Sequence, residues 1–327
     1  MKKCISLIVA AVLLLGCLSA CSFNTKKIEN KKLQIVTTIF PEYDWVMNVL
    51  GDKKEKADVT MLLDNGVDLH SYQPTADDIL KISSCDLFIY VGGESDKWID
   101  DALKEATNKN MVVINLLKVL GDSIKEEEVI EGMQAEAEEE EESEGEEEVE
   151  YDEHVWLSLR NASKIVSSIS EALQKIDADN AEAYKSNATA YTEKLNTLDS
   201  EYQKAVSEAS VKTLLFGDRF PFRYLVDDYG LSYYAAFVGC SAETEASFET
   251  ITFLAKKADE LNLNAVMTIE GKDHKIAQTI VQNTKNKNQK ILTMDSMQST
   301  TATDVQNGAT YISIMENNLT VLKDALK

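Results

Sequence analysis

The chain has 327 residues, of which 44% are hydrophobic, and a formal net charge of −23 at pH 7. This length and apolar content are enough for two domains with hydrophobic cores. The acidic balance excludes the basic face that a nucleic-acid-binding protein needs, and five cysteines in so long a chain do not indicate a disulfide framework.

The N-terminus has the pattern of a bacterial export signal. A short positive start is followed by an apolar run that is too short to span a membrane, and then by small residues. Residues 18–21 read LSAC, which is typical of a lipobox, where the signal is cut and the new N-terminal cysteine receives a lipid. We therefore expect residues 1–20 to be removed, Cys21 to be lipidated and residues 21–32 to form a polar tether. The alternatives are a cut before Cys17 and an ordinary secreted protein.

Short apolar strands alternate with helices through the first half of the chain. Strands are predicted at residues 34–38, 59–63, 87–91 and 111–115. Helices are predicted at residues 41–50, from Thr75 onward, at about 97–106 and at about 159–176. This strict order is typical of a parallel sheet covered by helices on both faces, so we assign residues 33–178 to an N-terminal α/β lobe.

An acidic stretch interrupts this lobe. Residues 126–153 contain 16 Glu and Asp152 but no Lys or Arg, so they contribute −17 to the net charge and leave −6 for the rest. Such a run repels itself and cannot bury apolar surface, so we expect a disordered loop over about residues 122–151. Its functional interpretation is weak collection of cations near a binding site, and the alternative is a merely solvated segment.

The alternation resumes in the second half, after a long amphipathic helix. The helix is predicted over residues 181–207, which lack Gly and Pro, and it either packs on the lobes or joins them as a stiff strut. Strands follow at residues 213–216, 233–237, 265–269 and 290–294, with a last helix at about 304–325. The predicted fold is α/β, with two parallel-sheet lobes joined by a long rigid helix. The linking helix takes residues 179–210 and the C-terminal lobe residues 211–327.

Two of the three histidines lie in segments of parallel chemistry. His70 stands in GVDLHSYQP (residues 66–74) and His154 in YDEHVWL (residues 151–157). Each histidine closely follows an acidic residue and precedes an aromatic one. Neutral imidazole is the commonest protein ligand of transition metals, and a nearby carboxylate can hold the other ring N–H. The pair therefore predicts a metal site.

The predicted strand ends support this interpretation. His70 follows the second strand of the first lobe and His154 follows the fourth. In the second lobe, Asp218, Glu270 and Asp295 follow the first, third and fourth strands. Ligands of open α/β sheets bind beyond the carboxyl ends of the strands. All five side chains thus lie where a metal site in the cleft between the two lobes would need them.

Each second-lobe candidate also has an ordinary structural interpretation. Asp218 can form a salt bridge with Arg219 or Arg223, and Glu270 can cap the helix that follows it. Asp295 can begin a turn or helix as its N-cap. His274, the one histidine of the second lobe, can replace a missing ligand or simply lie at the surface.

From about residue 33 to the C-terminus, the chain resembles the metal-binding lipoproteins of ABC importers that capture zinc or manganese. The segments around His70 and His154 match the first two metal loops of that family, with Glu153 where proline is usual. Residues 222–231, 266–270 and 293–296 match its second lobe. The resemblance implies two lobes joined by a long rigid helix, with Asp295 as the fourth ligand.

The chain departs from the family in two places. The third ligand, His or Glu in relatives, falls on Arg219, which cannot bind a metal. The loop before the second histidine is rich in glutamate, whereas many zinc-binding relatives have histidine there. Asp218 is adjacent to Arg219 and is expected to take over while Arg219 turns away to pair with another carboxylate. The expected ligands are His70, His154, Asp218 and Asp295, with Glu270 and His274 as second choices.

We therefore predict a binding protein rather than an enzyme. It captures a divalent ion, Zn²⁺ with Mn²⁺ as the alternative, outside the membrane and delivers it to an ABC permease. The resemblance implies a bacterial protein that is held at the cell membrane by the lipid at Cys21, acts as a monomer and has no nucleic-acid partner. A secreted metal-dependent hydrolase is one rival, although no HExxH motif is present. A lipid-anchored adhesin is another.

Overall fold

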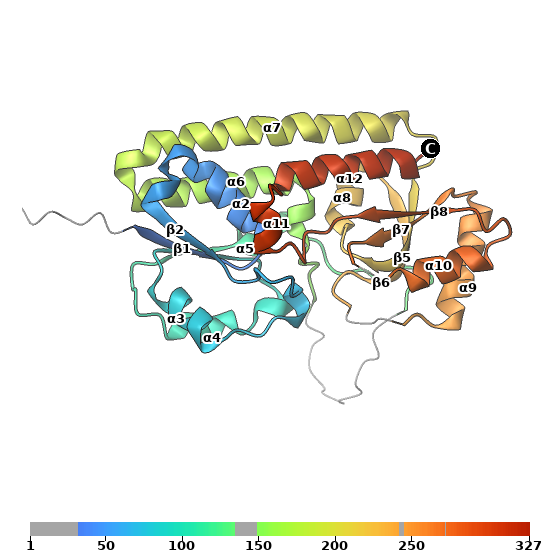
Figure 1. Cartoon of the computed structure of the whole chain (residues 1–327), viewed down its shortest axis with the longest axis horizontal. Helices are drawn as coiled ribbons and strands as arrows, with labels where there is room; N and C mark the ends of the chain where they lie inside the picture. Colours follow the sequence, from blue (N-terminus) through green and yellow to red (C-terminus); the bar gives the residue numbers. More distant parts are fainter. Residues whose placement is uncertain (1–31, 135–148, 242–244, 272) are drawn as a thin grey trace, which may run out of the picture. The chain divides into compact units, whose positions relative to one another are not determined.

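The structure is a computed structural model that describes residues 32–134, 149–241, 245–271 and 273–327. Residues Leu33–Lys327 form one compact unit (Figure 1). The predicted signal peptide, Cys21 and the tether up to residue 31 lie outside the described residues. In the described part of the chain, no helix has the length and apolar character needed to cross a membrane.

The first lobe is built on a four-stranded parallel sheet. Its strands are β1 (Leu33–Thr37), β2 (Ala57–Met61), β3 (Leu87–Tyr90) and β4 (Val112–Asn115), in the order β2-β1-β3-β4. Its helices are α2 (Phe40–Leu50), α3 (Ala76–Ser84), α4 (Ile99–Lys104), α5 (Leu116–Leu120) and α6 (Leu159–Ile176). The predicted capping residue Thr75 precedes α3 as its N-cap. Its hydroxyl accepts the backbone amide of Asp78, and the Asp78 carboxylate accepts the backbone amide of Thr75. The strand order changes direction between β1 and β3, where such sheets bind ligands.

The second lobe repeats this plan. Its strands are β5 (Thr213–Phe220), β6 (Ser232–Val238), β7 (Ala265–Ile269) and β8 (Lys290–Met294), in the order β6-β5-β7-β8. Its helices are α8 (Arg223–Tyr229), α9 (Phe248–Glu260), α10 (Lys275–Asn283), α11 (Ala302–Gln306) and α12 (Tyr311–Ala325). The single last helix predicted over 304–325 is wrong, because the chain turns between α11 and α12 at Gly308, whose φ is +99°. The predicted two-lobe α/β fold is confirmed.

The long helix α7 (Ala181–Glu208) ties the lobes together (Figure 1). One face is buried at helical spacing, and two tyrosines on that face reach different lobes. The Tyr191 hydroxyl donates to Asp44 Oδ2 in α2 at 3.1 Å, and the Tyr202 hydroxyl donates to the Met315 carbonyl in α12 at 2.7 Å. The 28 residues span about 42 Å, so α7 is the predicted rigid link.

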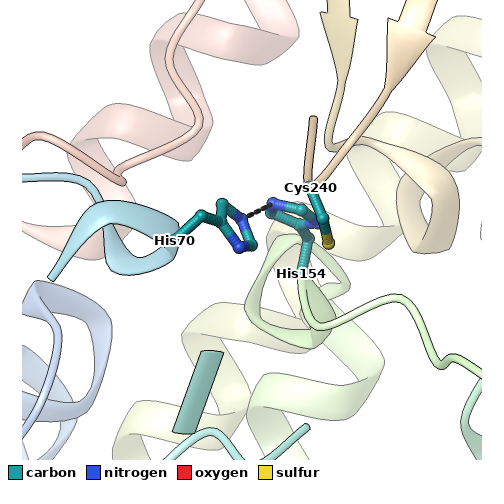
Figure 2. A group of neighbouring side chains, drawn as sticks. All are labelled: His70, His154 and Cys240. Atoms are coloured by element: carbon teal, nitrogen blue, oxygen red, sulfur yellow. Dashed lines mark hydrogen bonds between the residues drawn. The ribbon is translucent and has the colours of Figure 1, made fainter. Parts of the chain in front are cut away.

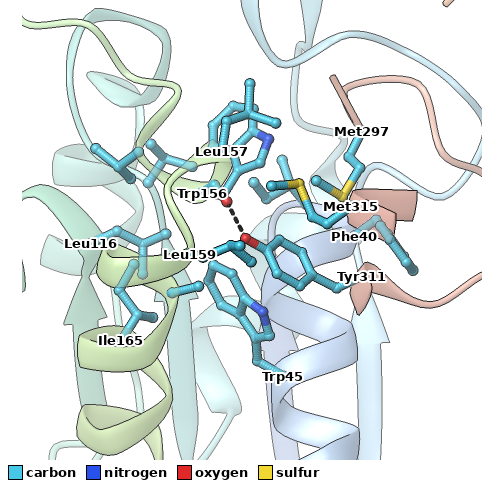
Figure 3. Close-up of a cluster of buried hydrophobic side chains, with 14 of the residues drawn as sticks. Phe40, Trp45, Leu116, Trp156, Leu157, Leu159, Ile165, Met297, Tyr311 and Met315 are labelled. Carbon is cyan, nitrogen blue, oxygen red and sulfur yellow. Dashed lines mark hydrogen bonds between the residues drawn. The ribbon is translucent and has the colours of Figure 1, made fainter. Parts of the chain in front are cut away.

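Buried aromatic side chains also connect the two lobes (Figure 3). Tyr311 of α12 packs edge-on against Trp45 of α2, with ring centroids 5.2 Å apart. Its hydroxyl donates to the Trp156 carbonyl at 2.6 Å, and the Trp156 indole donates to the Ser296 carbonyl at 2.8 Å. Segments of both lobes therefore share one core immediately beside His154, whose ring centroid lies 5.2 Å from that of Trp156.

The first part of the predicted acidic loop has defined contacts. Glu128 pairs with Arg223 at 2.8 Å, and the backbone amide of Gln134 donates to the Ala236 carbonyl in β6 at 2.9 Å. The expectation of disorder from about residue 122 therefore does not hold up to residue 134, because this segment finds basic and backbone partners on the second lobe. Residues 135–148 of the predicted loop lie outside the described residues.

Candidate metal centre

The two predicted histidines meet between the lobes. His70 lies on the short 3₁₀ turn η2 (Leu69–Ser71) after β2, and His154 directly precedes η5 (Val155–Leu157). Their Nε2 atoms are 3.2 Å apart, and Figure 2 shows the rings turned toward each other. His154 is fully buried. Residues separated by 84 positions in the chain thus converge as the sequence predicts.

An acidic neighbour orients the ring of His154. Asp152 Oδ1 accepts the backbone amide of His154 at 2.8 Å and its ring Nδ1 at 3.0 Å. Since a carboxylate accepts at Nδ1, the proton belongs there, and Nε2 carries the lone pair. The ring is set for metal binding by the arrangement that orients histidine ligands in metalloproteins.

The ring of His70 also has hydrogen-bonding partners at Nδ1, but they differ from that of His154. Its Nδ1 lies 2.8 Å from Ser95 Oγ and 3.5 Å from Glu153 Oε2. The preceding acid, Asp68, instead accepts the backbone amide of His70 at 3.0 Å. Burial, with His154 nearby, lowers the pKa of His70 to about 3, so the ring is neutral and one of its nitrogens has a lone pair available for a metal. Glu153 also accepts the backbone amide of Ser95 at its Oε1 at 2.9 Å, which helps to fix the residue that contacts His70.

A glutamine side chain sits at the two converging lone pairs. Gln298 Nε2 is 3.2 Å from His70 Nε2 and also hydrogen-bonds His154 Nε2. Gln298 is 4% exposed, and its Oε1 is buried without a hydrogen-bond partner in the described residues. An amide donor thus satisfies two acceptors that would otherwise face each other. Sequence reasoning missed Gln298, because an amide is not among the usual transition-metal ligands.

Cys240 completes a group of three donor atoms with the two histidines. In the part of the chain that the structure describes, His70, His154 and Cys240 form the one group of three or more His, Cys, Asp or Glu side chains whose donor atoms all lie within 4.8 Å of one another. Figure 2 shows the cysteine beside the His154 ring. The sequence analysis overlooked this residue, although it follows β6 at the same strand end as the other candidates.

A cavity of about 810 Å³ opens beside this group and is lined by both lobes. Arg219 and Asp68 form an ion pair across it. Although burial opposes the effect, Arg219 and His70 keep the pKa of Asp68 below its ordinary value. The expectation that Arg219 pairs with another carboxylate is confirmed, and the partner comes from the first metal loop.

The carboxylates predicted as ligands accept hydrogen bonds from backbone amides. Asp218 Oδ1 accepts the Arg219 amide at 3.0 Å, and Oδ2 accepts the Ile269 amide at 3.3 Å. Asp295 accepts the Met297 amide at 2.7 Å, and burial together with Glu270 raises the pKa of Asp295 to about 6. Neither belongs to the three-donor group.

The second choices also have structural partners or positions. Glu270 accepts the backbone amide and the hydroxyl of Ser296, each at 2.6 Å, and the backbone amide of Gln298 at 3.2 Å. It therefore fixes the loop that carries Gln298. His274 precedes α10 as its N-cap residue and is half-buried. Neither joins the three-donor group in the described residues.

Known proteins that resemble this chain in sequence are metal-binding transport components. The family described as "Zinc-uptake complex component A periplasmic" matches residues 35–325. The zinc-binding lipoprotein AdcA of Streptococcus pneumoniae is 32% identical over 323 residues, which cover 99% of this chain and 61% of that protein. The high-affinity zinc uptake system protein ZnuA of Bacillus subtilis is 32% identical over 323 residues, covering 98% and 96%. The chain thus spans about three fifths of the pneumococcal relative.

The chain is also similar in fold to solved structures of metal-binding proteins. The Zn(II)-bound ZnuA-like domain of Streptococcus pneumoniae AdcA matches with a TM-score of 0.69 at 30% identity, covering 90% of this chain and 99% of that domain. The metal-dependent lipoprotein YcdH of Bacillus subtilis matches with a TM-score of 0.72 at 29% identity, covering 90% and 99%.

Proposed function

The chain belongs to the family of periplasmic zinc-uptake component A proteins, and on this premise we propose that it captures Zn²⁺ outside the cytoplasmic membrane and delivers it to the permease of an ABC importer. Zinc is the cargo of such a protein, which is a transport component and not an enzyme. The zinc-binding names of its relatives support this choice of ion.

One observation carries the proposal. Two imidazoles, each with its Nδ1 within hydrogen-bonding distance of a partner, bring their Nε2 atoms to 3.2 Å from each other. Two acceptors so close together require a donor or a cation between them. Here Gln298 supplies the donor. A zinc ion that takes this position displaces the Gln298 amide and converts both imidazoles into ligands.

The ligands beyond His70 and His154 belong to the second lobe. Asp218 and Asp295 are our oxygen candidates, and each must release a backbone amide to reach an ion at the histidines. A site completed by these carboxylates would be hard enough to accept Mn²⁺ as well, while holding Zn²⁺ more tightly. Second-lobe ligation would let the bound ion fix the lobes in one arrangement for the permease to recognise.

The proposal also covers the attachment of the protein. The LSAC sequence at residues 18–21 supports lipid attachment at Cys21, and one relative is named a lipoprotein. We propose that the protein is anchored to the outer face of the bacterial cell membrane and acts there as a monomer, with the tether over residues 21–32 holding it near the permease.

Zinc titration of histidine variants tests this function. We expect the parent protein to bind one zinc ion per chain, and His70→Ala or His154→Ala to weaken binding at least about 100-fold, because each removes a nitrogen ligand. His274→Ala is the matched control and should bind like the parent protein. A double His70→Ala, His154→Ala variant that binds zinc as tightly as the control would overturn the proposal.

A further inference from the structure

We propose that Cys240 is the third ligand of the bound ion, so that the centre has two nitrogen donors and one sulfur donor. The proposal rests on the function above, because it assumes that the ion binds at His70 and His154. It assigns a role to a residue that stands outside the four expected ligands.

The first support is the position of the sulfur. The Cys240 Sγ belongs to the group of donor atoms that all lie within 4.8 Å of one another. Both histidines come from the first lobe, and Cys240 follows β6 of the second lobe. Of the second-lobe donors that the structure describes, it is the one already gathered with the histidines. Closing this group around an ion requires only small movements.

The second support is the way the backbone holds Cys240. At the preceding residue, Gly239, an added Cβ would lie 2.9 Å from His154 Cε1 and 2.9 Å from the Phe220 carbonyl. A side chain there would collide with the ring, so glycine allows the Cys240 segment to pack directly on His154. On the other side, the Cys240 amide donates to Glu127 Oε1 at 3.3 Å. The cysteine is thus held from both sides beside its partner ligand.

The third support is the pairing of Arg219 with a carboxylate at the site. This residue stands where relatives are expected to have the third ligand. Its guanidinium pairs with Asp68, and its Nη1 lies 3.5 Å from the Ser241 carbonyl, directly after Cys240. The carboxylate of Asp68 offsets the positive charge of Arg219, and the hydrogen bond to Ser241 braces the segment that carries the sulfur. The ligand position lost at β5 is in this way recovered at β6.

A fourth, independent observation is the buried amide of Gln298. Its Oε1 lacks a hydrogen-bond partner in the described residues, although the side chain is almost completely buried at the histidines. The histidine nitrogens and this oxygen can all donate electron pairs, so a cation can satisfy them together once the side-chain amide of Gln298 turns over. The protein is therefore built for an ion here.

Coordination by Cys240 has a chemical consequence for selectivity. The thiol loses its proton to solvent as the metal–sulfur bond forms. A thiolate is a soft ligand, and it favours zinc over manganese more strongly than a carboxylate does. The third ligand thereby narrows the cargo from divalent transition metals in general to zinc and its softer neighbours.

Cobalt binding to the full chain tests the assignment, because Co²⁺ bound by a thiolate has a sulfur-to-metal charge-transfer band in the near ultraviolet. We expect this band in the parent protein and in Cys85→Ser, a control that alters a cysteine buried in the first lobe. Cys240→Ser should lose the band and bind zinc at least about tenfold more weakly. His70→Ala should weaken cobalt binding itself.

The outcomes separate the two proposals. Cobalt that binds in a histidine-dependent way without the band overturns the role of Cys240 and leaves the function intact. Cobalt binding that ignores His70→Ala overturns the function. If Cys240→Ser does not fold, alkylation of the parent protein decides the matter by mass mapping of the Cys240 peptide. Zinc should slow labelling of Cys240 at least about tenfold, and unchanged labelling would overturn the assignment.

Discussion

Glu42 lies in the first turn of α2, and its carboxyl group is completely buried. Its Oε2 accepts the backbone amides of Thr38 and Ile39 at 2.8 and 3.3 Å and the Thr38 hydroxyl at 3.1 Å, whereas its Oε1 is buried without a partner in the described residues. Burial, reinforced by the charge of Asp96, raises the pKa of Glu42 to about 8. The folded protein therefore keeps a proton here at neutral pH.

The sign and size of the effect on stability follow from linkage. The unfolded chain releases this proton near the ordinary value of 4.5, and the folded protein releases it near 8. The folded state binds more protons between these values, so the free energy of unfolding falls as pH rises through this window and levels off above it. Each pKa unit corresponds to about 1.36 kcal/mol, so the whole window corresponds to on the order of 5 kcal/mol.

The substitution Glu42→Gln removes the titratable carboxyl group and keeps the size and shape of the side chain. The glutamine oxygen can accept the bonds now made by Oε2, and its amide can donate toward Asp96, whose Oδ1 also lacks a partner in the described residues. We expect the variant to have a shallower loss of stability with pH than the parent protein. The exposed residue Glu55 gives the matched control, Glu55→Gln, which should follow the parent protein.

Urea unfolding between about pH 5 and about pH 8, in chelator to exclude metal linkage, measures the difference. The gap in unfolding free energy between Glu42→Gln and the parent protein should grow in favour of the variant by several kcal/mol across this range. Parallel curves for the two proteins would refute the reasoning, because they would mean that Glu42 releases its proton at the same pH in the folded and unfolded states.

Three further predictions concern the site and its support. Asp152→Asn should weaken zinc binding about 10- to 100-fold in a competition titration without unfolding the protein, because it replaces the charged acceptor of His154 Nδ1–H with a neutral one and so makes the ring a weaker ligand. Unchanged affinity would contradict this role. Tyr311→Phe should lower the free energy of unfolding by about 1–3 kcal/mol in urea, since it leaves the buried Trp156 carbonyl without its donor, and no loss would count against the shared core. Deletion of residues 135–148 should leave the zinc dissociation constant within about twofold of the parent value at about 0.15 M salt. A run of carboxylates mainly raises the local concentration of cations, and salt screens this effect. An affinity about tenfold lower would mean that the segment supplies a ligand.

Much of the fold was predictable because its local signals agree with its packing. The helix expected at about 159–176 is α6, which Ser158 caps through the Asn161 amide, and the strands expected at 265–269 and 290–294 are β7 and β8. The last helix was predicted as one element, because apolar residues continue at helical spacing across Gly308 and conceal the turn there.

The site was predictable where two residues repeat one pattern. His70 and His154 each follow a predicted strand, with an acidic residue shortly before the histidine and an aromatic residue shortly after it, and these signals reinforce each other. Cys240 and Gln298 carry no such pattern, and their roles depend on tertiary contacts between the lobes. The pairing of Arg219 could be anticipated from charge alone, but its partner Asp68 could not, because 151 residues separate them.

Diffraction from crystals grown with equimolar zinc, recorded at the zinc absorption edge, would locate the ion that the two histidines are proposed to bind. We predict one anomalous peak within bonding distance of both Nε2 atoms of His70 and His154, about 2.0–2.1 Å, with the Gln298 amide nitrogen displaced from between them. A fully folded protein with no peak there, or with its single peak bound to other side chains, would contradict it.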